Sequence, residues 1–206
     1  MPLEGPAPSE AVTRPTKPLQ VPEKEDSPNP GIVQKRLALL GYLPAEPATG
    51  VWDARTAHAV HAFQAWEGLT RDGIVGPQTL AALENATRPR PASSAGYRHV
   101  EVHREKGVTL LVENGRVVRA LHSSSGGGTD ATPAGTYSVF RKELNSWSVP
   151  YEVWLPYASY FNRGIAFHGY RHVPAYPASH GCVRLPMADV PFAYAFMPIG
   201  TPVAVY

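Results

Sequence analysis

The chain has 206 residues, of which 43% are hydrophobic, and a formal net charge of +2 at pH 7. This length allows one or two domains with ordinary cores. So small a charge, without an arginine-rich helix or a glycine-aromatic motif, argues against a nucleic-acid partner. No run approaches the roughly 18 apolar residues that a membrane-spanning helix needs, so we expect no membrane span in this chain.

Residues 1–28 are rich in Pro, Glu, Lys and Ser and show no apolar period, which predicts a disordered tail. They also lack the apolar core of a signal peptide, so the chain is either cytoplasmic or exported through a signal trimmed from this sequence. The chain has one cysteine. In an exported protein, a single cysteine indicates either a pairing partner outside the chain or a reactive thiol.

Residues 29–86 predict a bundle of three short helices. Apolar residues recur at helical spacing in PGIVQKRLALLGYL, and Gly41 is a suitable C-terminal stop. Asp53 is a good N-cap for a second helix, and Gly76-Pro77 opens a third. We expect the core of this bundle to contain Leu37, Val60, Phe63, Leu80 and Leu83.

Two histidines, His58 and His61, lie one turn apart on the second predicted helix. Such a pair could ligate a metal ion, but on its own it is more typical of a partly exposed helix face. We adopt the second interpretation.

Three pieces of this segment carry a family resemblance: Leu-Gly-Tyr at 40–42, Phe-Gln at 63–64, and Asp-Gly-x-Val-Gly-Pro-x-Thr at 72–79. In this order they resemble the peptidoglycan-binding domains found on bacterial wall enzymes. The resemblance covers almost the whole helical segment and implies peptidoglycan as a partner.

Residues 87–96, TRPRPASSAG, predict a linker. A flexible linker would raise the effective concentration of a following enzyme at an insoluble polymer. The segment that follows, residues 97–206, reads as a separate domain because its periodicity changes from helical to alternating.

Strand-like runs follow one another at short spacing from Tyr97 onward. Asn114-Gly115 lies between two of them and is a strong hairpin signal. The Gly-rich run further along lacks the Gly-Lys-Ser/Thr end of a phosphate loop. One short helix is expected around Pro191, before a last strand at 201–206. The pattern predicts an α+β chain in which a small all-α bundle precedes a mostly β sandwich or barrel-like domain.

The only cysteine, Cys182, ends a Ser-His-Gly-Cys tetrapeptide at 179–182, and His168 lies upstream of it. A cysteine nucleophile reacts as the thiolate, which a nearby imidazole can generate and stabilise. The commoner fate of a free cysteine is burial as a small hydrophobe. The flanking histidine and glycine, and Arg184, disfavour that interpretation here.

This tetrapeptide resembles the active-site motif of the L,D-transpeptidases (YkuD-type). Other pieces agree with that family in their order: Ser-Ser-Gly at 124–126, Thr-Pro-x-Gly at 132–135, Gly-Ile-Ala-Phe-His-Gly at 164–169 and Gly-Thr-Pro-Val at 200–203. The resemblance covers all of residues 97–206 and implies a YkuD-like catalytic domain.

The resemblance implies roles for the residues of the motif. Cys182 would be the nucleophile and His168 the general base, with the backbone carbonyl near Gly169 orienting the imidazole. Gly181 lets the substrate approach, and its N–H is expected to face the developing oxyanion. His180 would support the turn.

Substrate contacts are expected beside this centre. An arginine fork suits the carboxylates of a stem peptide, and the short segment before the motif is stiff and aromatic. The candidates are Arg184, Ser179, Tyr170, Tyr176 and Trp154.

The resemblance implies attack by Cys182 on the bond between the L-centre of a diamino acid and D-Ala in a tetrapeptide stem. D-Ala leaves, and the acyl group passes to an amine of another stem, giving a 3→3 crosslink without a cofactor. With water as acceptor the protein would be an L,D-carboxypeptidase, and this alternative stays open. We expect a monomer that acts outside the cytoplasm at the cell wall, with carbapenems as possible inhibitors.

Two other hypotheses are weaker. A zinc-dependent wall peptidase could use His168, His172, His180 and Cys182 as ligands, but the chain has no His-Glu-x-x-His motif. A wall-binding protein with a decayed enzyme domain is disfavoured because the cysteine, histidine and glycine are all present together.

Overall fold

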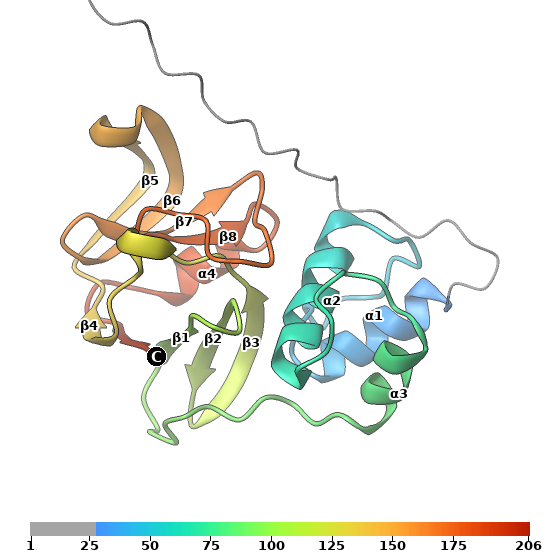
Figure 1. Ribbon diagram of the computed structural model, residues 1–206. Coiled ribbons are helices and arrows are strands. Elements are labelled where there is room, and N and C mark those ends of the chain that lie inside the picture. Colours follow the sequence, from blue (N-terminus) through green and yellow to red (C-terminus); the bar gives the residue numbers. More distant parts are fainter. Residues whose placement is uncertain (1–27) are drawn as a thin grey trace, which may run out of the picture.

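The computed structural model describes residues 28–206 (Figure 1). The tail predicted at 1–28 therefore lies, apart from Pro28, outside the described residues. The predicted order of a helical region followed by a mostly β region is confirmed. No helix in the described part of the chain is long and apolar enough to cross a membrane.

The helical unit contains α1 (Pro30–Leu39), α2 (Ala54–Glu67) and α3 (Pro77–Asn85). The predicted N-cap is confirmed, because Asp53 Oδ1 accepts a hydrogen bond of 2.7 Å from the N–H of Thr56. The predicted stop after α1 is also confirmed, since Gly41 has a φ of 87° that favours glycine.

Two buried glutamines hold two loops of this unit in the same way. Each amide NH₂ donates to a side-chain oxygen, a backbone carbonyl and a threonine hydroxyl, and each amide oxygen accepts from a glycine N–H. The partners are Thr49, Val51, Thr56 and Gly50 for Gln34, and Asp72, Ile74, Thr79 and Gly73 for Gln64. The segments TGVWDART (49–56) and DGIVGPQT (72–79) are thus two copies of one loop pattern, each of which leads into the next helix.

The strands form two sheets. They are β1 (His99–His103), β2 (Val108–Glu113), β3 (Arg116–His122), β4 (Gly135–Ser138), β5 (Arg141–Ser148), β6 (Val153–Asn162), β7 (Ile165–Tyr170), β8 (Val183–Pro186) and β9 (Pro202–Val205). The first sheet has the order β3-β2-β1-β9-β4 and the second β5-β6-β7-β8. The predicted hairpin joins β2 to β3, where Asn114 and Gly115 both have positive φ, as a tight hairpin turn requires.

The five-stranded sheet is covered on both faces. On one face Leu110 and Ala120 share a hydrophobic core with Val60 and Phe63 of α2. On the other face a second core includes residues of the four-stranded sheet and of α4 (Val190–Phe196), the short helix expected near Pro191. Figure 1 shows the helices beside β3, with α2 nearest to it. The helical unit is therefore a packed layer of the molecule.

Residues 87–96 have no helix or strand, as a linker should, but they do not hang free. The guanidinium of Arg88 donates to the carbonyls of Leu39 and Val117. Further along, the carboxylate of Glu101 accepts from the N–H groups of Ala92 and Ser93. The expectation of a flexible tether is wrong for this segment, because its hydrogen bonds fix it to both units.

Candidate active site

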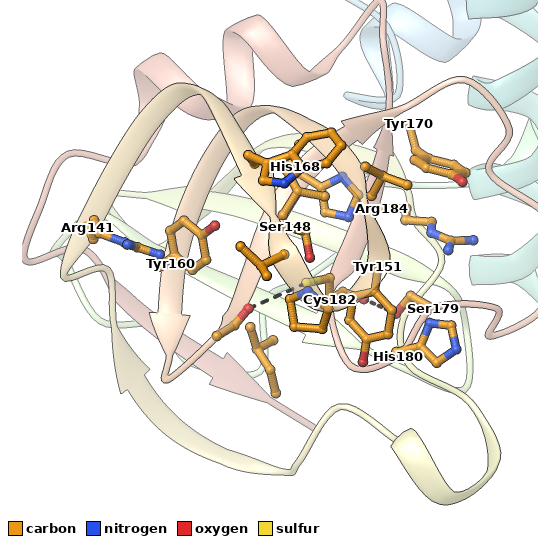
Figure 2. Close-up of a pocket in the computed structure, with 17 residues that line it drawn as sticks. Arg141, Ser148, Tyr151, Tyr160, His168, Tyr170, Ser179, His180, Cys182 and Arg184 are labelled. Carbon is orange, nitrogen blue, oxygen red and sulfur yellow. Dashed lines mark hydrogen bonds between the residues drawn. The ribbon is translucent and has the colours of Figure 1, made fainter.

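A pocket of about 600 Å³ opens on the four-stranded sheet (Figure 2). Its floor carries residues of β7 and β8, and the hairpin of β5 and β6 contributes one wall. Cys182, His168, Ser179, His180, Tyr170 and Arg184 all line it. Most of the predicted site residues therefore meet in one place.

Parallel pairing of β7 and β8 brings the two central residues together. His168 is opposite Arg184 in the register, and Cys182 lies two residues before Arg184. Cys182 comes just before β8, and both its thiol and the His168 imidazole line the same pocket. The Cys182 Sγ lies 3.8 Å from the carbonyl oxygen of Gly164. Burial raises the pKa of this thiol.

The imidazole of His168 is fixed by its own strand. Its Nδ1 lies 2.9 Å from the carbonyl oxygen of Gly169. A carbonyl only accepts, so Nδ1 carries the proton and Nε2 keeps a free lone pair. Burial lowers the pKa of His168 to about 4, which keeps the ring neutral at pH 7. A Cβ at position 169 would lie 2.6 Å from Met187 Sδ and 2.9 Å from Val190 Cγ1, so a larger residue here would displace these two side chains.

The turn before Cys182 is braced by hydroxyl groups. Ser179 Oγ donates to the carbonyl of Cys182 and accepts from the N–H of Gly181. Thr132 Oγ1 donates to the Gly181 carbonyl at 2.7 Å and accepts from the N–H of Gly126 at 2.9 Å. Gly181 has a φ of 109°, which a residue with a side chain rarely adopts. The turn is thus held in a fixed shape.

One predicted role disagrees with this geometry. The N–H of Gly181 was expected to face an oxyanion, but here it is donated to Ser179 Oγ at 3.2 Å. The bond forms because the serine hydroxyl folds back over the turn. Sequence reasoning also missed Thr132, which holds the turn from 49 residues away; its only signal was the Thr-Pro-x-Gly piece.

Two predicted substrate contacts do not line the pocket. Trp154 is 55% exposed and packs on Trp147, which takes its place in the lining. Tyr176 is 54% exposed, because its segment turns away from the pocket and its carbonyl accepts from Ser124 Oγ. His180 does line the pocket, and its ring stacks on Tyr151 at 4.5 Å.

The pocket is cationic. Arg184 and Arg141 line it, and among the described residues no Asp or Glu side chain does. The Arg184 guanidinium lies 4.1 Å from the ring centre of Tyr170, and that of Arg141 lies 3.8 Å from that of Tyr160. Figure 2 shows the two arginines on opposite sides of Cys182. Arg141 was missed in the sequence because no motif surrounds it.

Comparison with known proteins identifies the family of each region of the chain. The model of the L,D-transpeptidase catalytic domain (YkuD) matches residues 97–205, and that of a putative peptidoglycan binding domain matches residues 26–83. The chain belongs to the L,D-transpeptidase family. No relative among curated proteins matches.

The chain is similar to solved structures of L,D-transpeptidases. The L,D-transpeptidase (residues 123-326) of Xylanimonas cellulosilytica is 39% identical, with a TM-score of 0.81 over 90% of this chain and 100% of that one. An L,D-transpeptidase (Yku) of Stackebrandtia nassauensis is 27% identical, with a TM-score of 0.55 over 89% and 95%. An L,D-transpeptidase of Mycobacterium tuberculosis, 21% identical, shares the fold at a TM-score of 0.50 over 53% and 57%.

The candidate zinc ligands of this L,D-transpeptidase family member do not gather. His172 is exposed and lies outside the pocket that holds His168, His180 and Cys182. Within residues 28–206, no group of three or more His, Cys, Asp or Glu side chains is placed to hold a metal ion. The pocket does contain the thiol of Cys182 and the imidazole of His168.

Proposed function

We propose that this protein is a cysteine-dependent L,D-transpeptidase of peptidoglycan. One observation carries the proposal. The only cysteine of the chain shares a cationic pocket with a neutral histidine, and that histidine's Nδ1 is fixed on the Gly169 carbonyl. This is the arrangement of an activated nucleophile, with a main-chain oxygen as the orienting group.

The pair starts as a neutral thiol and a neutral imidazole, because burial disfavours both charges. His168 Nε2 takes the thiol proton as Cys182 Sγ attacks the carbonyl carbon of the diamino acid. The tetrahedral intermediate then collapses, the C–N bond breaks, and the imidazolium gives its proton to the departing amine of D-Ala. The product is a thioester on Cys182.

The second half of the reaction reverses these roles. The side-chain amine of another stem attacks the thioester, His168 takes a proton from that amine, and the C–S bond breaks. The proton returns to the thiolate, which regenerates the resting pair and leaves a 3→3 crosslink. Water in place of the amine gives the carboxypeptidase outcome.

The charges and aromatic rings of the pocket support a stem peptide as substrate. Such a peptide carries carboxylates, and Arg141 and Arg184 are the pocket's cations. Charge-assisted hydrogen bonds from a guanidinium fork suit a carboxylate. The oxyanion would be met by the N–H groups of His180 and Cys182, since that of Gly181 is donated to Ser179 Oγ.

The helical unit and the family support action at the cell wall, outside the cytoplasm. The L,D-transpeptidase LdtMt1 was solved in complex with imipenem. We infer that a carbapenem acylates Cys182 here, because its strained carbonyl offers the thiolate the same electrophile.

Intact-protein mass tests the proposal. The wild type and Cys182→Ala are mixed with a disaccharide-tetrapeptide, and D-Ala release is measured in parallel. We expect a transient adduct on the wild type alone, free D-Ala and a crosslinked dimer. D-Ala with tripeptide alone would assign the carboxypeptidase reaction. Activity that survives Cys182→Ala but is lost with a chelator would overturn the thiol mechanism.

A further inference from the structure

The segment that carries Cys182 is held from the helical unit on both of its flanks. Arg71, in the turn after α2, donates from Nη1 to the carbonyl of Ala175 at 3.1 Å. Arg55, within α2, donates from Nη2 to the carbonyl of Ala188 at 2.7 Å. Ala175 precedes the catalytic turn and Ala188 follows β8. Cys182 and β8 therefore lie between two contacts with α2 and the turn that follows it.

Arg71 also connects the two units at a third point. Its Nη2 donates to the carbonyl of Glu105 at 2.6 Å, in the turn between β1 and β2. One guanidinium thus binds two carbonyls that belong to different parts of the catalytic domain. A fork with several donors in one plane can do this, and an ammonium group cannot do it in the same geometry.

A stack of three histidines supports the same flank. The rings of His58 and His61 of α2 lie 5.4 and 5.2 Å from that of His122 on β3. His122 in turn donates from Nε2 to the carbonyl of Val173 at 2.9 Å. All three histidines are buried, which corrects the expectation of a partly exposed helix face for His58 and His61. The stack fills the space between α2 and the flank.

The flank contacted by Arg71 and His122, residues 171–178, leads directly into the turn at 179–182 that ends in Cys182. Residues 171–178 form no helix or strand, so their position depends on these individual bonds. Ser124 Oγ binds the carbonyl of Tyr176, and the carbonyl of Ser125 accepts from the N–H groups of Ala178 and Ser179. Ala175 lies four residues before Ser179 in this irregular segment, so the Arg71 bond and the bonds of Ser124 and Ser125 together position the turn that presents the thiol.

We propose that the helical unit is a positioning element of the active site as well as a wall-binding module, with Arg71 as its positioning residue. The proposal rests on the proposed function. Loss of the Arg71 bonds loosens the flank and lowers the fraction of time in which the thiol and imidazole are aligned, which lowers kcat. Substrate affinity depends on the pocket arginines and aromatic rings, so KM changes little.

Three full-length variants test this with a soluble disaccharide-tetrapeptide, which makes binding to insoluble wall irrelevant. They are Arg71→Ala, Arg71→Lys and the control Lys35→Ala, a charge removed from an exposed position on α1. The kcat and KM for D-Ala release, the Tm, and the rate of Cys182 alkylation by iodoacetamide across pH are measured. The alkylation rate reports thiol activation by His168 without needing the substrate.

For Arg71→Ala we expect a kcat about three- to tenfold lower than that of the wild type. This is the effect of losing roughly one or two hydrogen bonds. The KM should stay within about twofold of the wild-type value. Alkylation near neutral pH falls in parallel. Lys at 71 keeps the charge and one of the two bonds, so it restores part of both rates. Lys35→Ala behaves as the wild type.

A wild-type kcat and alkylation profile in Arg71→Ala would overturn the proposal. The proposal would also be overturned if the loss of activity only followed the fall in Tm, with kcat per folded molecule unchanged. If Arg71→Ala does not fold, Arg71→Lys decides by the same readouts. A wild type that is alkylated normally by iodoacetamide but releases no D-Ala would overturn the proposed function instead. The alkylation rates of the Arg71 variants would still test the positioning role of Arg71.

Discussion

His122 and His168 are buried to nearly the same extent on two different sheets, and burial lowers the pKa of both, to about 3 and about 4. Each also donates one ring N–H to a backbone carbonyl, that of Val173 or Gly169. The difference lies in the second nitrogen. The Nδ1 of His122 is buried without a partner among the described residues, and its ring stacks against α2.

His168 instead lines the pocket that contains Cys182. The comparison shows that burial and a carbonyl partner make a neutral, oriented imidazole, but they do not make a base. A base also needs access to a cleft and to a group that gives up a proton. The same local chemistry serves packing on the five-stranded sheet and, in the proposed mechanism, catalysis on the four-stranded one.

The largest expected effect separates these two histidines by rate. His168→Gln should lower kcat/KM for D-Ala release by about 10²- to 10⁴-fold, the usual contribution of a general base. His122→Gln should lower it by about tenfold or less. In the wild type, a neutral His168 with a pKa of about 4 keeps the base competent well below pH 6.

The pH dependence of the His168→Gln variant gives the control. Its residual activity should rise with pH as the thiol of Cys182 ionises without help. Equal losses of kcat/KM in the His122 and His168 variants would contradict the assignment of His122 to packing and of His168 to the role of base.

The next effect tests whether the helical unit and the five-stranded sheet share one hydrophobic core and unfold together. Leu110 is fully buried between the five-stranded sheet and the helices. Leu110→Ala should lower the free energy of unfolding by about 2–5 kcal/mol. Far-UV circular dichroism, which follows the helices, and tryptophan fluorescence should report one shifted transition. A helical transition that stays at its wild-type temperature would show that the two units unfold independently.

Local features of the fold were predictable from the sequence because their causes are local. The Asp53 cap needs only a carboxylate three residues before the N–H that it accepts. The hairpin at Asn114-Gly115 needs only two residues that tolerate positive φ. The pairing of Cys182 with His168 followed from a family motif, and its geometry depends on two neighbouring strands.

What the sequence could not predict depends on partners distant in the chain. His58 looked like a residue of an exposed helix face because the ring that covers it, His122, comes from another domain. The N–H of Gly181 looked free because the rotamer of Ser179 cannot be read from sequence. Arg141 carries no motif, and only the fold of the β5–β6 hairpin brings it to the pocket.

A smaller effect should appear in stability against pH. Burial lowers the pKa values of His58 to about 4 and of His122 to about 3, and it lowers that of His61 too, against about 6.5 in the unfolded chain. The unfolded state then binds more protons below pH 6.5, so stability is full above that pH and falls as pH decreases. Each histidine contributes at most about 1.4 kcal/mol per pH unit.

Thermal unfolding between pH 7 and 5 measures this slope. The groups around the stack are Asp72, whose charge opposes the lowering at His61, and Arg71 and His172, whose charges reinforce it at His122 and His58. His122→Gln should flatten the slope by about one proton. A wild-type Tm that does not fall toward pH 5 would argue against a neutral stack.

The smallest effect concerns charge at the cleft. Arg141 is half-exposed, and its nearest carboxylate, Glu143, lies at 3.4 Å. Exposed ion pairs contribute little, so Arg141→Ala should raise KM for the tetrapeptide about two- to fivefold with kcat unchanged. The effect should shrink at high salt. Arg116→Ala, a charge removed from an exposed position on β3, is the matched control.

The Arg141 result also tests why the face of the five-stranded sheet that packs on the helices is apolar, whereas the pocket on the four-stranded sheet is cationic. The helical face joins two protein layers and needs only apolar area and neutral rings. Under the proposed function, the cleft attracts an anionic peptide from water, which requires cations that stay hydrated until substrate arrives. A substrate with amidated carboxylates should therefore show the same KM in the wild type and in Arg141→Ala. If Arg141→Ala instead leaves KM for the carboxylate form unchanged, the attraction must come from Arg184, which lies on β8 two residues after the nucleophile.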